Sequence, residues 1–321
     1  MRAIQIQEHG GPEVMKVVDL PVREPGPTEV RIRHHAIGVN FIDTYQRAGL
    51  YKQPMPFIPG SEGAGVVEAA GANARFAVGD RVAYAANTAG SYAETRVIDS
   101  NLVVKLPDAI SFEAAAAMML KGLTVQYLLR RTWPLKKGDH ILWHAAAGGV
   151  GLIACQWAKA LGLHLIGTAG GPDKCALARG YGAEAMIDYH ADDFVARVRE
   201  IVPAGVAVAF DSVGKDTVMK SLACIRPLGL LVSFGNASGA PAPLDILELS
   251  RRGSLYVHRP TLGAHTTIPG ALELMAVDLF EIVLSGQVKI EVNQRWPLEQ
   301  AAEAHRALEG KHTTGATILT L

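Results

Sequence analysis

Three closely spaced glycines mark the segment of the chain best suited to specific chemistry. Gly148, Gly149 and Gly151 follow an apolar run from Ile141 to Ala145 and precede a helical pattern at residues 152–161. Glycines in such a turn let backbone N–H groups approach a pyrophosphate, and the N-terminus of the following helix adds a partial positive charge. The segment therefore predicts a strand, a turn and a helix that bind a dinucleotide.

The glycine spacing departs from the usual fingerprint, because Ala146 stands where the first of three glycines belongs. A plain glycine turn without a ligand is the alternative interpretation. The strand before the turn, the helix after it and the repetition of this βαβ pattern further along the chain favour the dinucleotide site. The contacts predicted in the turn are Ala147, Gly148, Gly149 and Val150.

The end of the second predicted strand indicates which dinucleotide binds. NAD-specific folds place an Asp or Glu there to bind the ribose, whereas this chain reads Thr-Ala-Gly-Gly at residues 168–171. The open space at Gly170 suits a 2′-phosphate, and Lys174 could supply the countercharge, so the sequence predicts NADPH. Asp173 as a displaced ribose ligand for NAD, and Lys174 as an ordinary solvated lysine, are the alternatives.

The composition restricts the class of protein. The chain has 321 residues, of which 49% are hydrophobic, and it carries 31 basic and 31 acidic residues. The length indicates two domains, and the balanced charge gives no overall attraction to nucleic acid or to an anionic membrane. The N-terminal residues do not resemble a signal peptide and no long apolar stretch is present, so we expect a cytoplasmic protein. The three cysteines suggest neither a metal knuckle nor a disulfide framework.

The pattern of elements changes twice along the chain. Residues 1–122 contain short β-like runs separated by turn clusters, which predicts an irregular, mostly β domain. Strands and helices alternate over residues 123–262, which indicates a doubly wound, six-stranded parallel sheet. Residues 263–321 have no place in that sheet, and we expect them to return to the first domain. The cofactor would then lie in the cleft beside an inserted nucleotide domain.

The individual elements are predicted from apolar runs and helical spacing. The six strands of the parallel sheet are predicted at Ile141 to Ala145, His164 to Ala169, Ala185 to Tyr189, Val206 to Ser212, Gly229 to Phe234 and Ser254 to Arg259. Further elements are predicted as an alanine-rich helical run at 113–119, a helix near 269–285, a strand-like run at 287–292, a helix near 298–308 and a closing strand at 315–321.

Several long segments, in the same order, carry a resemblance to a known family. They are GVNFIDTYQRAGLY at 38–51, PFIPGSEGAGVV at 56–67, MMLKGLTVQYLL at 118–129, the glycine turn, FDSVGKDT at 210–217, VSFGNASGA at 232–240 and GSLYVHRPTL at 253–262. From end to end the chain resembles the zinc-independent quinone oxidoreductases, the zeta-crystallin-like branch of the medium-chain dehydrogenase/reductase superfamily. This resemblance implies an α/β protein with a GroES-like, mostly-β catalytic domain and a Rossmann domain.

The resemblance also gives meaning to the absence of zinc ligands in this chain. Zinc-dependent members of this superfamily hold the catalytic zinc through a Cys in the first domain and through the His of a Gly-His-Glu motif, which matches PGSEG here. This chain has Ser61 at the histidine position and no cysteine before Cys155, so neither a catalytic zinc nor a four-cysteine lobe is expected. His34, Asp43 and Glu62 could in principle bind a metal, but nothing in their spacing recommends it.

Site residues follow from the same resemblance. It implies that Asn40, Tyr45 and Tyr51 lie beside the nicotinamide and the substrate, although a turn former and core aromatics are the alternative interpretations. Asn40 and Tyr45 would donate hydrogen bonds or position the substrate. The further cofactor residues that it implies are Thr124 at the nicotinamide end, Lys174 and Tyr189 around the adenosine phosphate, Ser212, Phe234, Gly235 and Asn236 along the cofactor, and Lys311 as a weaker candidate.

The activity implied is NADPH-dependent reduction of small quinones without a metal. A quinone is a strong electrophile, so the site needs little beyond a positioned hydride donor and stabilisation of the oxyanion that forms. Reduction of the activated double bond of an enone or alkenal is the enzymatic alternative.

A binding or structural role, with RNA or as a crystallin, is a second alternative, although basic pairs such as Arg130-Arg131 and Arg251-Arg252 are more typical of solvated helix ends and turns. We also expect a homodimer that pairs through the edge strand at Ser254 to Arg259; an edge covered within a monomer is the alternative.

Overall fold

The computed structural model describes all 321 residues, which pack into two compact units. Unit 1 comprises Met1–Leu123, Thr266–Leu284 and Ile290–Leu321, and unit 2 comprises Thr124–His265 and Ser285–Lys289. The predicted domain boundaries at 122 and 262 stay a prediction, because packing alone does not show which part folds independently. None of the helices combines the length and the apolarity that crossing a bilayer requires.

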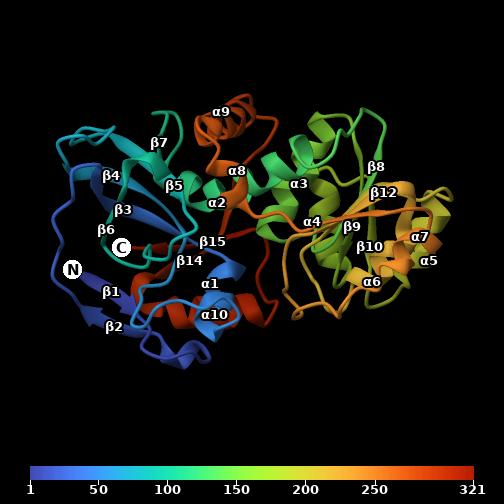
Figure 1. Cartoon of the computed structure of the whole chain (residues 1–321), viewed down its shortest axis with the longest axis horizontal. Coiled ribbons are helices and arrows are strands. Elements are labelled where there is room, and N and C mark those ends of the chain that lie inside the picture. The colour runs from blue at the N-terminus through green and yellow to red at the C-terminus, as the bar shows by residue number, and fades with distance from the viewer. The chain divides into compact units, whose positions relative to one another are not determined.

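Unit 2 is built on a six-stranded parallel sheet, which confirms the predicted fold class (Figure 1). The spatial order β10-β9-β8-β11-β12-β13 corresponds to 3-2-1-4-5-6 in chain order, the order of a Rossmann fold. Its strands are β8 (His140–Trp143), β9 (His164–Ala169), β10 (Ala185–Asp188), β11 (Val206–Asp211), β12 (Ile225–Ser233) and β13 (Tyr256–His258).

Helices cover both faces of this sheet, so its central strands are mostly apolar and buried. Every residue of β11 is buried, as a strand covered on two sides requires. Helices α3 (Gly149–Ala160) and α4 (Pro172–Gly180) pack on each other, and Figure 1 shows α5 (Phe194–Ile201) and α6 (Val218–Ser221) on the other face. The remaining elements of this part are η3 (Leu222–Cys224), α7 (Leu247–Arg251) and α8 (Leu262–Thr266), whose last residue belongs to unit 1.

Unit 1 contains a seven-stranded, mostly antiparallel sheet around the long strand β3 (Glu29–Val39). Strand β3 pairs with β4 (Glu62–Ala70), β6 (Thr95–Asp99) and β15 (Ala316–Thr320), so the C-terminal residues complete a sheet that the first hundred residues begin. The other strands are β5 (Arg81–Ala85), β7 (Val103–Lys105) and β14 (Val292–Pro297), and β1 (Arg2–Gln5) and β2 (Lys16–Asp19) form a separate pair.

Helices α1 (Phe41–Ala48) and α10 (Ala301–Glu309) pack on each other in unit 1 (Figure 1). Helix α9 (Ala271–Leu284) also belongs to this unit, as do residues 112–123 of α2 (Phe112–Arg130). Short 3₁₀ turns lie at η1 (Pro12–Val14), η2 (Ser100–Leu102) and η4 (Leu298–Gln300). Helix α1 follows directly after β3, and Lys121 on α2 contacts Glu62 at the start of β4.

Three elements differ from the sequence prediction. The strand-like run at 287–292 is wrong, because strand pairing begins only at Val292 and Lys289 instead exchanges two hydrogen bonds with the Gln156 side chain. The alanine-rich run is part of one helix that reaches from Phe112 to Arg130. The last strand of the parallel sheet is shorter than predicted, and Ser254 before it has a φ of 58°, which no strand residue adopts.

Candidate active site

Asn40 lies between the end of β3 and the start of α1, and two hydrogen bonds fix it. Its backbone N–H donates to Asp43 Oδ2 at 2.9 Å, which satisfies a donor that the helix cannot use. Its side-chain Nδ2 donates to Glu62 Oε2 at 2.8 Å. Because all three residues are buried, the Asn40 amide is held in one orientation.

Glu62 is the buried anion of this region. It accepts hydrogen bonds from Lys121 Nζ at 3.0 Å and from the Leu120 backbone N–H at 2.8 Å, besides the one from Asn40. The Glu62 side chain is 0% exposed and that of Lys121 is 6% exposed, so two opposite charges are buried as a hydrogen-bonded pair. A Cβ at Gly38 would lie 2.2 Å from Glu62 Oε2, so the facing position on β3 must be glycine.

A chain of buried hydrogen bonds leads away from Asp43. Asp43 Oδ2 accepts from the Tyr92 hydroxyl at 3.0 Å, and the same hydroxyl lies 3.0 Å from His305 Nε2. Arg47 Nη1 lies 3.0 Å from His305 Nδ1, and a guanidinium can only donate. His305 is therefore neutral with its hydrogen on Nε2, and it donates to Tyr92, which donates to Asp43. This tautomer is assigned from the network.

The titration of these groups follows from their burial. Burial raises the pKa of Asp43 to about 7, although hydrogen bonds from Asn40 and Tyr92 act in the opposite direction. Burial, helped by the charge of Arg47, lowers the pKa of His305 to about 3. Ser61 donates to Asp43 Oδ1 at 3.3 Å. The Asp43 carboxyl thus joins α1 to the loop before β4, and through Tyr92 it is connected to His305 on α10.

The two tyrosines of the predicted site lie together. The rings of Tyr45, on α1, and Tyr51, in the loop after it, pack edge to face with centroids 5.6 Å apart, and the Tyr51 N–H donates to the Tyr45 carbonyl at 3.2 Å. Tyr45 is half-buried, and 37% of Tyr51 is exposed. Since α1 is anchored through Asp43, the network described above also fixes the place of Tyr45.

His34, the other residue that could in principle bind a metal, belongs to a different network. Its Nδ1 donates to the Ala93 carbonyl at 2.7 Å, and its Nε2 lies 2.7 Å from the Tyr84 hydroxyl. Burial lowers the pKa of His34 to about 4, so the imidazole is neutral. Its two ring nitrogens are both engaged within the core of unit 1.

The glycine turn of unit 2 leaves the carboxyl end of β8 and enters α3. The Gly148 N–H donates to the Ala145 carbonyl at 3.0 Å, and α3 begins at Gly149. A Cβ at Gly151 would lie 2.5 Å from the carbonyl oxygens of Ala145 and Ala146, so only glycine lets the helix start this close to the strand. Ala147 is buried and Val150 half-buried beside these glycines. The turn and the helix N-terminus present backbone donors at the sheet edge where doubly wound folds bind dinucleotides.

At the end of β9 the structure brings together residues from two strands. A Cβ at Gly170 would lie 2.7 Å from the Tyr189 hydroxyl, so these two predicted residues are neighbours. Lys174 lies half-buried in the first turn of α4. Sequence reasoning missed Asp188, whose Oδ1 accepts from the Gly171 N–H at 2.9 Å and from the His190 N–H at 3.0 Å. These backbone donors lower the pKa of Asp188, so an anion does lie near this loop, although β9 itself supplies none.

The predicted residues after β11 and β12 also meet. A Cβ at Gly235 would lie 2.4 Å from the Ser212 carbonyl oxygen, and the Phe234 ring packs on Trp143 with centroids 5.6 Å apart. Arg259, which sequence reasoning did not select, donates to the Gly235 carbonyl at 3.1 Å and so positions this loop. Asn236 is buried in the same segment.

The last two predicted cofactor residues are Thr124 and Lys311. Thr124 is buried on α2 and bonds to Tyr127, whose ring stacks on His265 with centroids 4.5 Å apart. Lys311 is exposed after α10 in unit 1, with a φ of 58°. The roles of all the predicted site residues remain proposals.

The fold and these clusters define a medium-chain dehydrogenase/reductase. Residues 26–108 match the alcohol dehydrogenase GroES-like domain family, and residues 149–277 match the zinc-binding dehydrogenase family. The chain is 54% identical to the quinone oxidoreductase of Pseudomonas aeruginosa, over 99% of each chain. It belongs to the quinone oxidoreductase family, as its sequence motifs predicted.

Two further comparisons bear on the chemistry. The structure of Escherichia coli quinone oxidoreductase complexed with NADPH superposes on this chain with a TM-score of 0.98, at 45% identity and with complete coverage of both chains. The 2-haloacrylate reductase of a Burkholderia species is 40% identical over 99% of this chain and 98% of its own.

Proposed function

We propose that the protein reduces small quinones with NADPH and that the reaction needs no metal. The observation that carries this proposal is the unit formed by β8, the glycine turn and α3, where Gly151 brings the helix N-terminus against the strand end. The full-length likeness to quinone oxidoreductases confirms the predicted enzyme class, and a relative solved with NADPH confirms the predicted cofactor.

The residues of unit 2 fit the cofactor. The backbone N–H groups of Gly149 and Val150, in the first turn of α3, can bind the pyrophosphate, and Gly151 lets this turn lie close to the end of β8. Lys174 can neutralise a 2′-phosphate, while Asp188 is already engaged by two backbone donors and shapes the loop. We infer that this combination favours NADPH over NADH.

The residues of unit 1 suit an acceptor that is already electrophilic. Bound NADPH would supply a hydride, and the protein must then orient the acceptor and stabilise the oxyanion. The Asn40 amide, fixed by Glu62, and the Tyr45 hydroxyl are the donors that we assign to this task. Asp43 is buried under Tyr92 and Ser61, so we give it a positioning role rather than contact with the acceptor.

Reduction of an activated carbon–carbon double bond is the second candidate. The likeness to 2-haloacrylate reductase favours it, because hydride addition to such a double bond also develops negative charge on a conjugated oxygen. The same two donors would serve both reactions.

One assay separates these candidates. NADPH and NADH oxidation is followed with 1,4-benzoquinone, with 2-chloroacrylate and with a simple enal, always in the presence of EDTA. Rapid NADPH-selective turnover of the quinone supports the proposal, whereas faster turnover of the acrylate or the enal would replace it with the second candidate. Loss of quinone turnover on addition of EDTA would overturn the metal-free reaction.

A further inference from the structure

Two histidines and a glutamate gather on unit 2 without a part in the proposed reaction. His140 is the first residue of β8, His164 is the first residue of β9, and Glu184 directly precedes β10. All three therefore lie at the amino ends of neighbouring parallel strands. The glycine turn follows the carboxyl end of β8. This group and the predicted dinucleotide site therefore lie at opposite ends of the same parallel strands.

The backbone holds the three residues side by side. His140 and His164 are paired across β8 and β9, and partners on adjacent strands are about 4.8 Å apart. The Glu184 N–H donates to the Leu165 carbonyl at 3.0 Å, which ties it to the strand that carries His164. Only the side chains would have to move to bind a common ligand.

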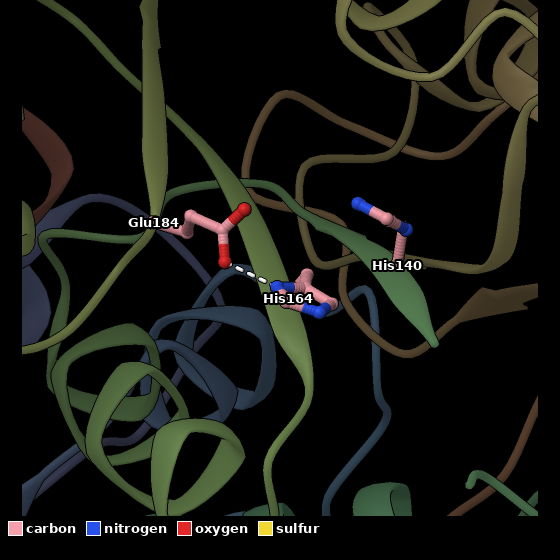
Figure 2. A group of neighbouring side chains, drawn as sticks. All are labelled: His140, His164 and Glu184. Carbon is pink, nitrogen blue, oxygen red and sulfur yellow. Dashed lines mark hydrogen bonds and ion pairs between the residues drawn. The ribbon is translucent and has the colours of Figure 1, made fainter. Parts of the chain in front are cut away.

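The side chains already approach one another. Figure 2 shows the His164 imidazole between Glu184 and His140, with a hydrogen bond from His164 Nδ1 to the Glu184 carboxylate. The two imidazole rings stack with centroids 4.7 Å apart. One nitrogen from each histidine and one carboxylate oxygen lie within 4.8 Å of one another.

We propose that His140, His164 and Glu184 bind a divalent transition metal of the zinc type, with water completing a four-coordinate site. Two imidazoles and a carboxylate are a donor set that zinc accepts, whereas Mg²⁺ and Ca²⁺ prefer oxygen donors alone.

The side chains must rotate to bind one ion, because the two imidazole rings are stacked and their nitrogen lone pairs do not yet point to a common position. In a tetrahedral zinc site the donor atoms are about 3.3–3.5 Å apart, so the most distant pair must close by up to about 1.5 Å. The His164 and Glu184 side chains are 40% and 54% exposed, which leaves them free to turn and gives the ion access from solvent. The ion would take the place of the hydrogen bond that His164 Nδ1 now donates to Glu184, and it would connect three neighbouring strands.

The first test uses the full chain, treated with EDTA and then dialysed. Calorimetric titration with ZnCl₂ should give one zinc per chain, and saturating zinc should raise the unfolding temperature by about 3 °C or more because it binds only the folded form. MgCl₂ should leave that temperature unchanged. Absence of zinc binding up to about 100 µM, a range weaker than structural sites show, would overturn the proposal.

Matched variants locate the site. His140→Gln and His164→Gln should each weaken zinc binding at least about tenfold, because each removes a ligand. His190→Gln is the control, since His190 is an exposed histidine of the same unit with its Nδ1 4.0 Å from Asp188 Oδ1. Zinc binding that is equal in His140→Gln, His164→Gln and the unchanged chain would contradict the proposal.

Cobalt absorption detects the metal site without an activity assay, and NADPH binding shows whether the variant is folded. Co²⁺ in a four-coordinate site of this kind should give visible absorption bands that His164→Gln abolishes. An unchanged NADPH dissociation constant in the same variant would show that unit 2 is still folded. Retention of the cobalt bands in that variant would place the metal elsewhere.

Discussion

At the residue scale, removal of the Tyr45 hydroxyl tests whether this residue positions the acceptor or is an obligatory proton donor. Tyr45→Phe keeps the ring that packs on Tyr51 and removes only the hydroxyl. We expect kcat/KM for benzoquinone to fall less than tenfold, because one hydrogen bond is worth about 1 kcal/mol. Tyr256→Phe, which removes the hydroxyl of an exposed strand residue, is the control. A loss of a thousandfold or more in steady-state assays would make Tyr45 an essential proton donor.

The raised pKa of Asp43 predicts that the stability of the folded chain depends on pH. Its pKa of about 7 lies above that of an unfolded aspartate, so the folded chain binds the proton more tightly. The stabilisation is therefore complete below about pH 4 and is lost as the pH rises through 7, by at most about 1.4 kcal/mol per pH unit. Urea unfolding at pH 5 and pH 8 should show that the unchanged chain loses more stability than Asp43→Asn over this interval.

The comparison with Asp43→Asn removes the contribution of the histidines. The lowered pKa values of His34 and His305 make stability rise with pH as the unfolded histidines lose their protons, up to about pH 6.5. That contribution is common to both proteins. The prediction would be contradicted if the unchanged chain gained stability relative to Asp43→Asn between pH 5 and pH 8. The donors around Asp43 would then be stabilising an ionised carboxylate.

At the scale of elements, the start of α3 depends on one missing side chain. Gly151→Ala would place a Cβ 2.5 Å from two carbonyl oxygens, so the helix must move away from β8. We expect a loss of about 1–3 kcal/mol in the free energy of unfolding and weaker NADPH binding, by about tenfold or more.

Gly180→Ala is the matched control for this prediction. A Cβ at Gly180 meets nothing within 4 Å, and the residue ends α4 in the same unit. Fluorescence titration with NADPH should show no change for this variant. Equal NADPH affinity for Gly151→Ala and the unchanged chain would show that the turn does not contact the cofactor.

Elements whose signal is local were predictable from the sequence, whereas α1 was not. The glycine turn and the apolar strands of unit 2 follow from short windows of sequence, and the six strands occur in the predicted order. Helix α1 buries polar residues, among them Asp43, Thr44, Gln46 and Arg47, so its pattern does not show a core-facing apolar stripe. Its stability comes from partners such as Tyr92 and Glu309, far away in the chain.

The same reason limits prediction of the site. Asn40, Glu62 and Lys121 meet only because β3 pairs with β4 and α2 packs over them, and their spacing in the sequence does not specify that contact. The sequence contains a weak signal for the proposed metal site. Two histidines begin consecutive strands, at His140 and His164, and Glu184 directly precedes the third strand. Strand register, which decides whether such residues meet, is a long-range property.

At the scale of the whole molecule, β13 is an exposed edge strand of the parallel sheet. It ends the six-stranded sheet, and Tyr256 and Val257 are 54% and 41% exposed, so the edge is not covered within the chain. An exposed apolar edge has backbone groups that can pair with another chain, and pairing with a symmetry-related copy satisfies them in a closed dimer. We therefore propose a homodimer in which two sheets join through β13.

A charge placed on that edge tests this proposal. Sedimentation at micromolar concentration should give twice the mass of the chain, and Val257→Lys should reduce it to one chain, because a lysine at the edge would be buried against its own copy. Val277→Lys, at an exposed apolar position on α9, should leave the dimer intact. A monomeric unchanged chain would reject the dimer, and a dimer that persists in Val257→Lys would place its interface on another surface.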